Sequence, residues 1–203
     1  ASPRPAQRAY RHAGMDRTVS DPAVPTVFQR ALGAPFFNLP ASVRRLHAIR
    51  GTARYAGVAT VERGRNPLAR LCARLAGLPG AMREAPITVE FVADAKGEAW
   101  RRDFAGTRMH SRLAFRDGLL RERIGPLQFR HALLANAGAI WWRVEGVRLL
   151  GVLPLPARWF RGVRCRESEQ DGRYRFQIDA ALPLVGRVIR YEGWLEPVDD
   201  AAA

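Results

Sequence analysis

Five polar residues lie at positions where the pattern of the chain predicts apolar, inward-facing side chains. They are Arg102, Ser111, Glu122, His131 and Arg187, and each lies between apolar residues two positions away. Successive side chains of a strand point to opposite faces, so all five are expected on an apolar face. An unpaired charge in a dry core is very costly. The pattern therefore allows two interpretations: the groups pair with one another or lie near water at strand ends, or they line a partly polar cavity.

The second interpretation predicts a site for a ligand with an apolar body and an anionic or hydrogen-bonding head. A guanidinium group can hold a carboxylate or phosphate through two parallel hydrogen bonds, and an imidazole can be a pH-sensitive donor. Together with the five polar residues, five aromatic residues complete the candidate ligand-binding set. These aromatic residues are Trp100, Phe129, Trp142, Phe176 and Tyr191.

No motif in the sequence names a catalytic chemistry. Gly146 and Gly151 lack the strand–turn–helix spacing of a dinucleotide-binding loop, and no Gly-x-Ser-x-Gly elbow is present. The histidines, at positions 12, 47, 110 and 131, do not place two ligands on one helical turn as a zinc site would. We therefore predict no catalytic residue, no metal ligand and no cofactor.

The chain is strongly basic, with a formal net charge of +14 carried almost entirely by arginine. Such a charge attracts nucleic acid and acidic lipid without specificity. The neighbouring Trp141 and Trp142 suggest base stacking, but adjacent strand residues face opposite sides, so only one ring can join such a surface. We predict no specific nucleic-acid partner.

Alternation of apolar and polar residues predicts strands through most of the chain. Asp117-Gly118 and Asp171-Gly172 are strong tight-turn signals, and short connections force neighbouring strands to be antiparallel. A sheet of about 9–10 strands does not stay flat. We therefore predict an α+β fold: a strongly curved antiparallel sheet or half-barrel with two or three N-terminal helices packed on it. The predicted strands are 52–62, 87–93, 98–104, 108–116, 119–124, 127–134, 139–150, 163–169, 173–181 and 185–195.

Two short helices are predicted before residue 51, and a third between its N-cap Asn66 and Gly77. Leu68, Leu71 and Leu75 form an apolar stripe along the third helix. A stripe of this kind predicts that the helix docks on the sheet with Leu71 and Leu75 buried.

The predicted domain organisation is a flexible basic leader at residues 1–20, a single α+β domain at 21–197 and a disordered tail at 198–203. No run approaches the roughly 18 apolar residues of a transmembrane helix. Cys72 and Cys165 are far apart and lack metal-ligand spacing, so we expect them to be reduced in a cytoplasmic protein.

A series of short motifs follows in order along nearly the whole chain after residue 26. They are Phe28–Gly33, Leu39-Pro40, Leu46-His47, Gly51–Gly64, Leu68–Gly77, Arg123–Leu127, Leu149–Pro156, Asp171–Phe176, Leu182–Gly186 and Tyr191–Leu195. In these motifs and their order the chain resembles the bacterial family called domain of unknown function 4166. The resemblance implies a small stand-alone domain here, whereas in similar longer proteins the domain can follow a nicotinamide-nucleotide-binding domain of the saccharopine dehydrogenase type. The family brings no established activity and no catalytic residues.

The predicted function is that of a soluble domain, a non-catalytic module that binds a lipophilic small molecule in the concave side of the sheet. Two alternatives remain open. The resemblance implies an accessory or substrate-handling domain for a nucleotide-dependent oxidoreductase. Exposed aromatic residues such as Trp159 and Phe160 would instead suit a domain that binds a protein partner.

Overall fold

The computed structural model describes residues 24–198. The leader predicted at residues 1–20 lies outside the described residues, as does the predicted tail except for Val198. Within residues 24–198, no helix is long and apolar enough to cross a membrane. The elements are α1 Val27–Leu32, η1 Ala34–Asn38, α2 Ala41–His47, β1 Gly51–Arg63, α3 Pro67–Leu75, β2 Met82–Ala93, β3 Glu98–Phe104, β4 Thr107–Arg116, β5 Leu119–Ile124, β6 Leu127–Asn136, β7 Ala139–Leu149, β8 Leu153–Leu155, η2 Ala157–Phe160, β9 Gly162–Gln170, β10 Arg173–Leu182 and β11 Gly186–Pro197.

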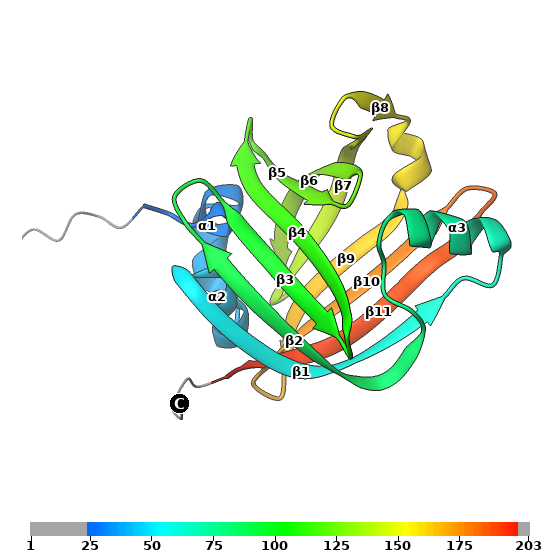
Figure 1. Ribbon diagram of the computed structural model, residues 1–203. Coiled ribbons are helices and arrows are strands. Elements are labelled where there is room, and N and C mark those ends of the chain that lie inside the picture. Colours follow the sequence, from blue (N-terminus) through cyan, green and yellow to red (C-terminus); the bar gives the residue numbers. More distant parts are fainter. Residues whose placement is uncertain (1–23, 199–203) are drawn as a thin grey trace, which may run out of the picture.

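The strands form a closed antiparallel barrel (Figure 1). Around the barrel the order is β6-β5-β4-β3-β2-β1-β11-β10-β9-β7, and β7 also pairs with β6, which joins the two ends of the sheet. Strand β7 closes the barrel because one of its edges pairs with β6 over most of its length. Its other edge pairs with β9 through Ile140–Trp142 and with the short β8 through Val147–Leu149. The prediction of an open curved sheet or half-barrel is therefore wrong.

The α+β assignment is also wrong, because the fold is mainly β. Its three α-helices have only 6, 7 and 9 residues. Apart from the short β8, which was not predicted, the strands lie within about five residues of the predicted ranges. Two of the hairpins have the expected tight turns: Asp117-Gly118 has φ values of 54° and 75°, and Asp171-Gly172 has 54° and 74°. Positive φ at both central residues gives the turn a twist that matches the flanking strands.

Helices α1 and α2 plug one end of the barrel (Figure 1). Phe28 of α1 is fully buried, and its ring centre lies 3.7 Å from that of His47 and 5.9 Å from that of Trp100. We call this the plugged end, and it carries the turns at 94–97, 117–118, 137–138 and 171–172. We call the opposite end the α3 end, and it carries the connections 64–81, 105–106, 125–126, 150–161 and 183–185.

Helix α3 turns its small residues to the barrel and its leucines to solvent. Ala69 and Ala73 are fully buried, whereas Leu68, Leu71 and Leu75 are 48%, 49% and 66% exposed. The prediction that Leu71 and Leu75 are buried is therefore wrong. We refer to these three residues below as the α3 leucines.

Close approach of the backbone explains why α3 packs through alanine. A Cβ atom added to Gly64 would lie 1.8 Å from the carbonyl oxygen of Arg187 and 2.9 Å from Cβ of Ala69. A larger side chain at position 69 would not fit this gap. Just beyond the C-terminus of the helix, the carbonyl oxygen of Ala76 is 3.2 Å from a Cβ placed on Gly125, in the β5–β6 turn. Strands β11 and β5 lie on opposite sides of the barrel, so α3 runs across the α3 end.

Gly57 marks the tightest contact between β1 and β11. A Cβ atom at this position would lie 1.8 Å from the carbonyl oxygen of Trp194, so the two backbones would have to separate. Gly57→Ala is expected to cost about 1–3 kcal/mol of unfolding free energy, the usual range for overpacking. Urea unfolding would measure it, with Gly80→Ala as the matched control because a Cβ there meets no atom within 4 Å. Equal stability of the two variants would contradict the close approach.

Candidate functional site

A cavity of about 100 Å³ lies inside the barrel, between the plug and the α3 end. Three of its lining residues near the α3 end, Ile124, Val163 and Ile178, are only half-buried. No residue of α3 is part of the lining. Most of the lining is aromatic or aliphatic, and these residues are Ile87, Val89, Phe91, Trp100, Phe104, Ile124, Phe129, Trp142, Val163, Phe176, Ile178 and Leu195.

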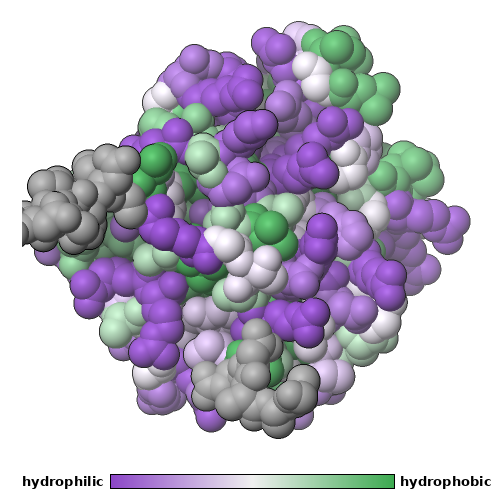
Figure 2. Space-filling model, turned by 60° about the vertical axis from the view of Figure 1, so that its left-hand side comes forward, coloured by the Kyte–Doolittle hydropathy of each residue, from purple (hydrophilic) through white to green (hydrophobic). Residues whose placement is uncertain are grey.

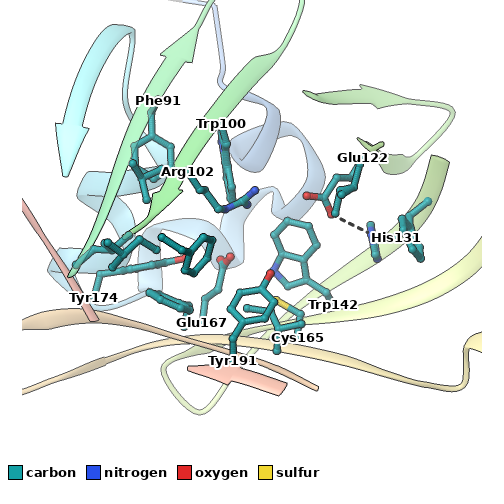
Figure 3. Close-up of a pocket in the computed structure, with 18 of the residues that line it drawn as sticks. Phe91, Trp100, Arg102, Glu122, His131, Trp142, Cys165, Glu167, Tyr174 and Tyr191 are labelled. Atoms are coloured by element: carbon teal, nitrogen blue, oxygen red, sulfur yellow. Dashed lines mark ion pairs between the residues drawn. The ribbon is translucent and has the colours of Figure 1, made fainter. Parts of the chain in front are cut away.

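Arg102 is the cation of the cavity and reaches into it from β3 (Figure 3). Its Nη1 donates a hydrogen bond to Oγ of Ser111 on β4 over 2.9 Å. Its guanidinium carbon lies 4.7 Å from the centre of the Trp100 ring, a cation–π distance. Among the described residues Arg102 has no ion-pair partner. Since a guanidinium carries five N–H donors, most of them stay available for a ligand.

Glu122 and His131 form the second polar group, on the neighbouring strands β5 and β6 (Figure 3). The carboxylate Oε2 and the ring Nε2 are 3.5 Å apart, and both side chains are almost fully buried. Burial by itself opposes ionisation of Glu122. The nearby His131, Arg102 and Ser111 outweigh that effect, and the pKa of Glu122 is lowered below its ordinary value. The cavity therefore holds a carboxylate as well as a guanidinium.

Two buried polar atoms of the cavity wall lack a partner. Nδ1 of His131 and Nε1 of Trp142 have no hydrogen bond within the described part of the chain, whereas Nε2 of His131 faces the Glu122 carboxylate. Buried polar groups are nearly always hydrogen-bonded in folded proteins, to protein or to water. Two unsatisfied nitrogen atoms beside one cavity are therefore places where a bound molecule or water would gain hydrogen bonds.

At the plug side of the cavity, Glu167 of β9 pairs with His47 of α2. The carboxylate Oε2 lies 2.7 Å from Nε2 of His47, and the two side chains are 3% and 0% exposed. A second carboxylate on the same strand, that of Glu169, accepts a hydrogen bond from the backbone N–H of Ser42 over 2.8 Å. Two glutamates of one strand thus hold α2 in the end of the barrel.

Neutral hydroxyl and thiol groups complete the lining. Burial, with the Glu167 carboxylate as the next cause, raises the pKa of Tyr174 and of Cys165 well above their ordinary values. Burial is also the main cause that raises the pKa of Tyr191. The two phenols therefore remain protonated donors at neutral pH. The Cys165 thiol remains protonated too, which makes it a poor nucleophile.

The structure brings most of the predicted ligand-binding residues together. Arg102, Glu122 and His131 line the cavity, and Ser111 contacts it indirectly, through Arg102. All five predicted aromatic residues line it as well: Trp100, Phe129, Trp142, Phe176 and Tyr191.

Arg187 lies apart from this group. It is about half exposed on the outside of the barrel, where it pairs with Glu62 and Asp179. The reason is a β-bulge: Ile189 pairs with Ala180 and Arg187 with Ala181, which leaves Val188 as an extra residue on β11. An extra residue reverses the alternation of a strand, so the inward position expected for Arg187 does not hold.

Three cavity residues outside the predicted ligand-binding set also have the inward spacing of their strands. Cys165 and Glu167 follow Val163 at this spacing, and Tyr174 has the same spacing to Phe176. His47 carried no such signal, because its partner Glu167 is 120 positions away in the sequence.

Two further observations concern metal ligands and aromatic stacking. No three His, Cys, Asp or Glu residues in the described ranges cluster as metal ligands. Trp142 is buried in the cavity wall, whereas Trp141 is exposed beneath Arg166 on the outside of the barrel. The two rings therefore face opposite sides, as predicted, and do not form one stacking platform. The arrangement is suited to holding a small apolar group beside a cation and a carboxylate.

The family model of a domain of unknown function, DUF4166, matches residues 39–195. No curated protein matches the chain.

Proposed function

Since the chain belongs to the DUF4166 family, whose description names no activity, we propose a function from the barrel interior: reversible binding of a small apolar molecule with an anionic or hydrogen-bonding head. The observation that carries the proposal is the guanidinium of Arg102, which makes no ion pair among the described residues and lies in a mainly apolar cavity. Pockets that bind small molecules have this composition, with apolar walls and a few convergent polar groups.

The size of the cavity restricts the ligand. Its volume of about 100 Å³ is below the roughly 300–1,000 Å³ of sites for drug-sized molecules. An engineered cavity of about 150 Å³ accepts benzene. We therefore propose a ligand whose buried part is no larger than a single aromatic ring, or a larger lipophilic molecule that places only such a part inside.

The proposed position of the ligand follows from the polar groups. Its head would lie beside Arg102, near Nδ1 of His131 and Nε1 of Trp142, which have no hydrogen bond among the described residues. The neutral phenols of Tyr174 and Tyr191 would add donors. A ligand carboxylate would be held by Arg102. The positive charge of Arg102 would offset the repulsion between this carboxylate and that of Glu122. No catalytic step is part of this proposal.

The test compares benzoate with its neutral analogue benzyl alcohol by calorimetric titration. Arg102→Met is expected to weaken benzoate binding by about 10- to 100-fold, because a hydrogen bond to a charged group contributes about 1.5–3 kcal/mol. Benzyl alcohol binding is expected to change by less than about threefold. Arg101→Met is the matched control. Arg101 precedes Arg102 in the chain, but its guanidinium is exposed and pairs with Glu90 on the outside of the barrel.

The same variants distinguish a ligand-binding role of Arg102 from a structural one. Without ligand, Arg102→Met is expected to lower the free energy of unfolding by no more than about 1.5 kcal/mol, the value of one hydrogen bond. The side-chain hydrogen bond that would be lost is the one from Arg102 to Ser111. A loss of about 3–5 kcal/mol would mean that Arg102 neutralises a buried carboxylate, and the binding proposal would fail. Absence of benzoate binding to the wild type would also count against an anionic head.

A further inference from the structure

The α3 end of the barrel concentrates the exposed apolar residues of the molecule. Eight of the thirteen large apolar residues exposed in the described structure belong to its connections. They are the α3 leucines, four residues of the 150–161 connection (Leu150, Val152, Leu153 and Trp159) and Leu184. Leu184, at the tip of the β10–β11 turn, is completely exposed.

These residues form an arc of separate apolar clusters because their connections are neighbours. Around the barrel, α3 follows β1, the 183–185 turn joins β10 to β11, and the 150–161 connection joins β7 to β9. Figure 2 shows green clusters at the upper and right-hand edges of the molecule, set among hydrophilic side chains. Monomeric proteins rarely expose large apolar patches, and a patch rimmed by polar residues marks an interaction surface.

The polar residues of the same arc carry one sign of charge. Five exposed arginines lie in the two longer connections: Arg65, Arg70, Arg74, Arg158 and Arg161. Neither residues 64–82 nor residues 146–166 contain an aspartate or glutamate. Among the described residues, these five guanidinium groups make no ion pair, although arginines elsewhere on the barrel, such as Arg101 and Arg173, do.

From this combination we infer that the α3 end is a docking surface for a lipid bilayer with anionic headgroups. Leucine and tryptophan side chains on short protruding segments insert at the boundary between headgroups and acyl chains. Arginines beside them bind the anionic headgroups, an attraction that is screened by salt. A folded protein partner would need a matching acidic surface, whereas a bilayer accepts an arc of separated apolar tips.

The geometry gives this surface a consequence for the cavity. Ile124 and Val163 of the cavity lining lie at strand ends on the α3 side, so docking would bring this side of the cavity close to the bilayer. A lipophilic ligand could then pass between bilayer and barrel without crossing water. Docking itself does not depend on the proposed ligand, because its groups lie outside the cavity.

The experiment is co-sedimentation of the full chain with vesicles of phosphatidylcholine alone or mixed with phosphatidylglycerol. We expect binding to the mixed vesicles, at least about tenfold weaker binding to the neutral ones, and loss of binding in about 1 M salt, where the Debye length is about 3 Å. The apolar variant Leu71→Ser/Leu75→Ser and the charge variant Arg70→Gln/Arg74→Gln are each expected to weaken binding at least about tenfold.

The control variant is Leu134→Ser/Arg116→Gln, which removes an equally exposed leucine and an arginine away from the α3 end. It is expected to bind like the wild type, and melting temperatures would establish that all variants fold. Equal loss in the control would assign binding to the general basic charge and overturn the inference. Absence of binding to mixed vesicles would overturn it too. So would a dimer in sedimentation velocity that the apolar variant dissociates, because the arc would then be covered by a second copy.

Discussion

His47→Leu is expected to lower the free energy of unfolding by about 3–5 kcal/mol, the usual result of leaving a buried charge without its partner. The imidazole is completely buried and lies 2.7 Å from the Glu167 carboxylate. Leucine fills much of the space but cannot donate a hydrogen bond. The buried Glu167 side chain would then lose the partner that lies 2.7 Å away. Urea unfolding at neutral pH measures the loss.

The double variant His47→Leu/Glu167→Met separates pairing from packing. Replacing both partners of a buried pair by apolar residues of similar volume is often neutral or stabilising. The double variant is therefore expected to recover most of the stability lost by the single one. A loss below about 1 kcal/mol for His47→Leu would show that the pair does not hold the plug. A double variant as unstable as the single one would show that the imidazole acts by packing against Phe28.

The free energy of unfolding of the barrel is expected to fall steeply at alkaline pH. The pKa values of Tyr55, Tyr174 and Tyr191 are all raised, in each case mainly by burial. A group with a raised pKa in the folded state stabilises the protein fully below its unfolded pKa, which is about 10 for tyrosine. That contribution is lost as the pH rises from about 10 through the folded pKa, because only the unfolded chain releases the proton.

The expected slope is large because three phenols act together. Each contributes about 1.4 kcal/mol per pH unit, so the free energy of unfolding should fall by about 4 kcal/mol per unit above pH 10. The raised pKa of Cys165 adds to the loss from about pH 8.5 upward. Urea unfolding at a series of pH values measures the slope, and tyrosinate absorbance reports ionisation.

Tyr191→Phe provides the control for the alkaline prediction. It removes one of the three phenols and should reduce the slope above pH 10 by about a third. In the wild type, tyrosinate absorbance from these residues is expected to appear only together with unfolding. Ionisation of the three phenols well before unfolding would mean that solvent reaches the interior freely.

The sequence by itself determined the local structure of the barrel wall and much of the composition of its interior. Alternation and Asp-Gly turns depend on residues close together in the chain, so the strands, their antiparallel order and the opposite directions of Trp141 and Trp142 were all predictable. The family was recognisable from the order of short motifs, and the match over residues 39–195 confirms it. Arg102, Glu122 and His131 lie in regular strand segments, so their inward direction followed from alternation as well.

Tertiary structure alone decided closure, the direction of α3 and the plug. Closure depends on the twist and stagger accumulated over all the strands and on β7, whose two edges meet β6 and β9, whereas alternation is the same in an open sheet. The apolar stripe of α3 predicted its buried face wrongly, because the tight approach at Gly64 admits only a small residue such as Ala69. One bulge residue on β11 moved Arg187 out of the interior. The His47–Glu167 pair spans 120 positions, and a contact at that distance exists only once the barrel has closed around the helix.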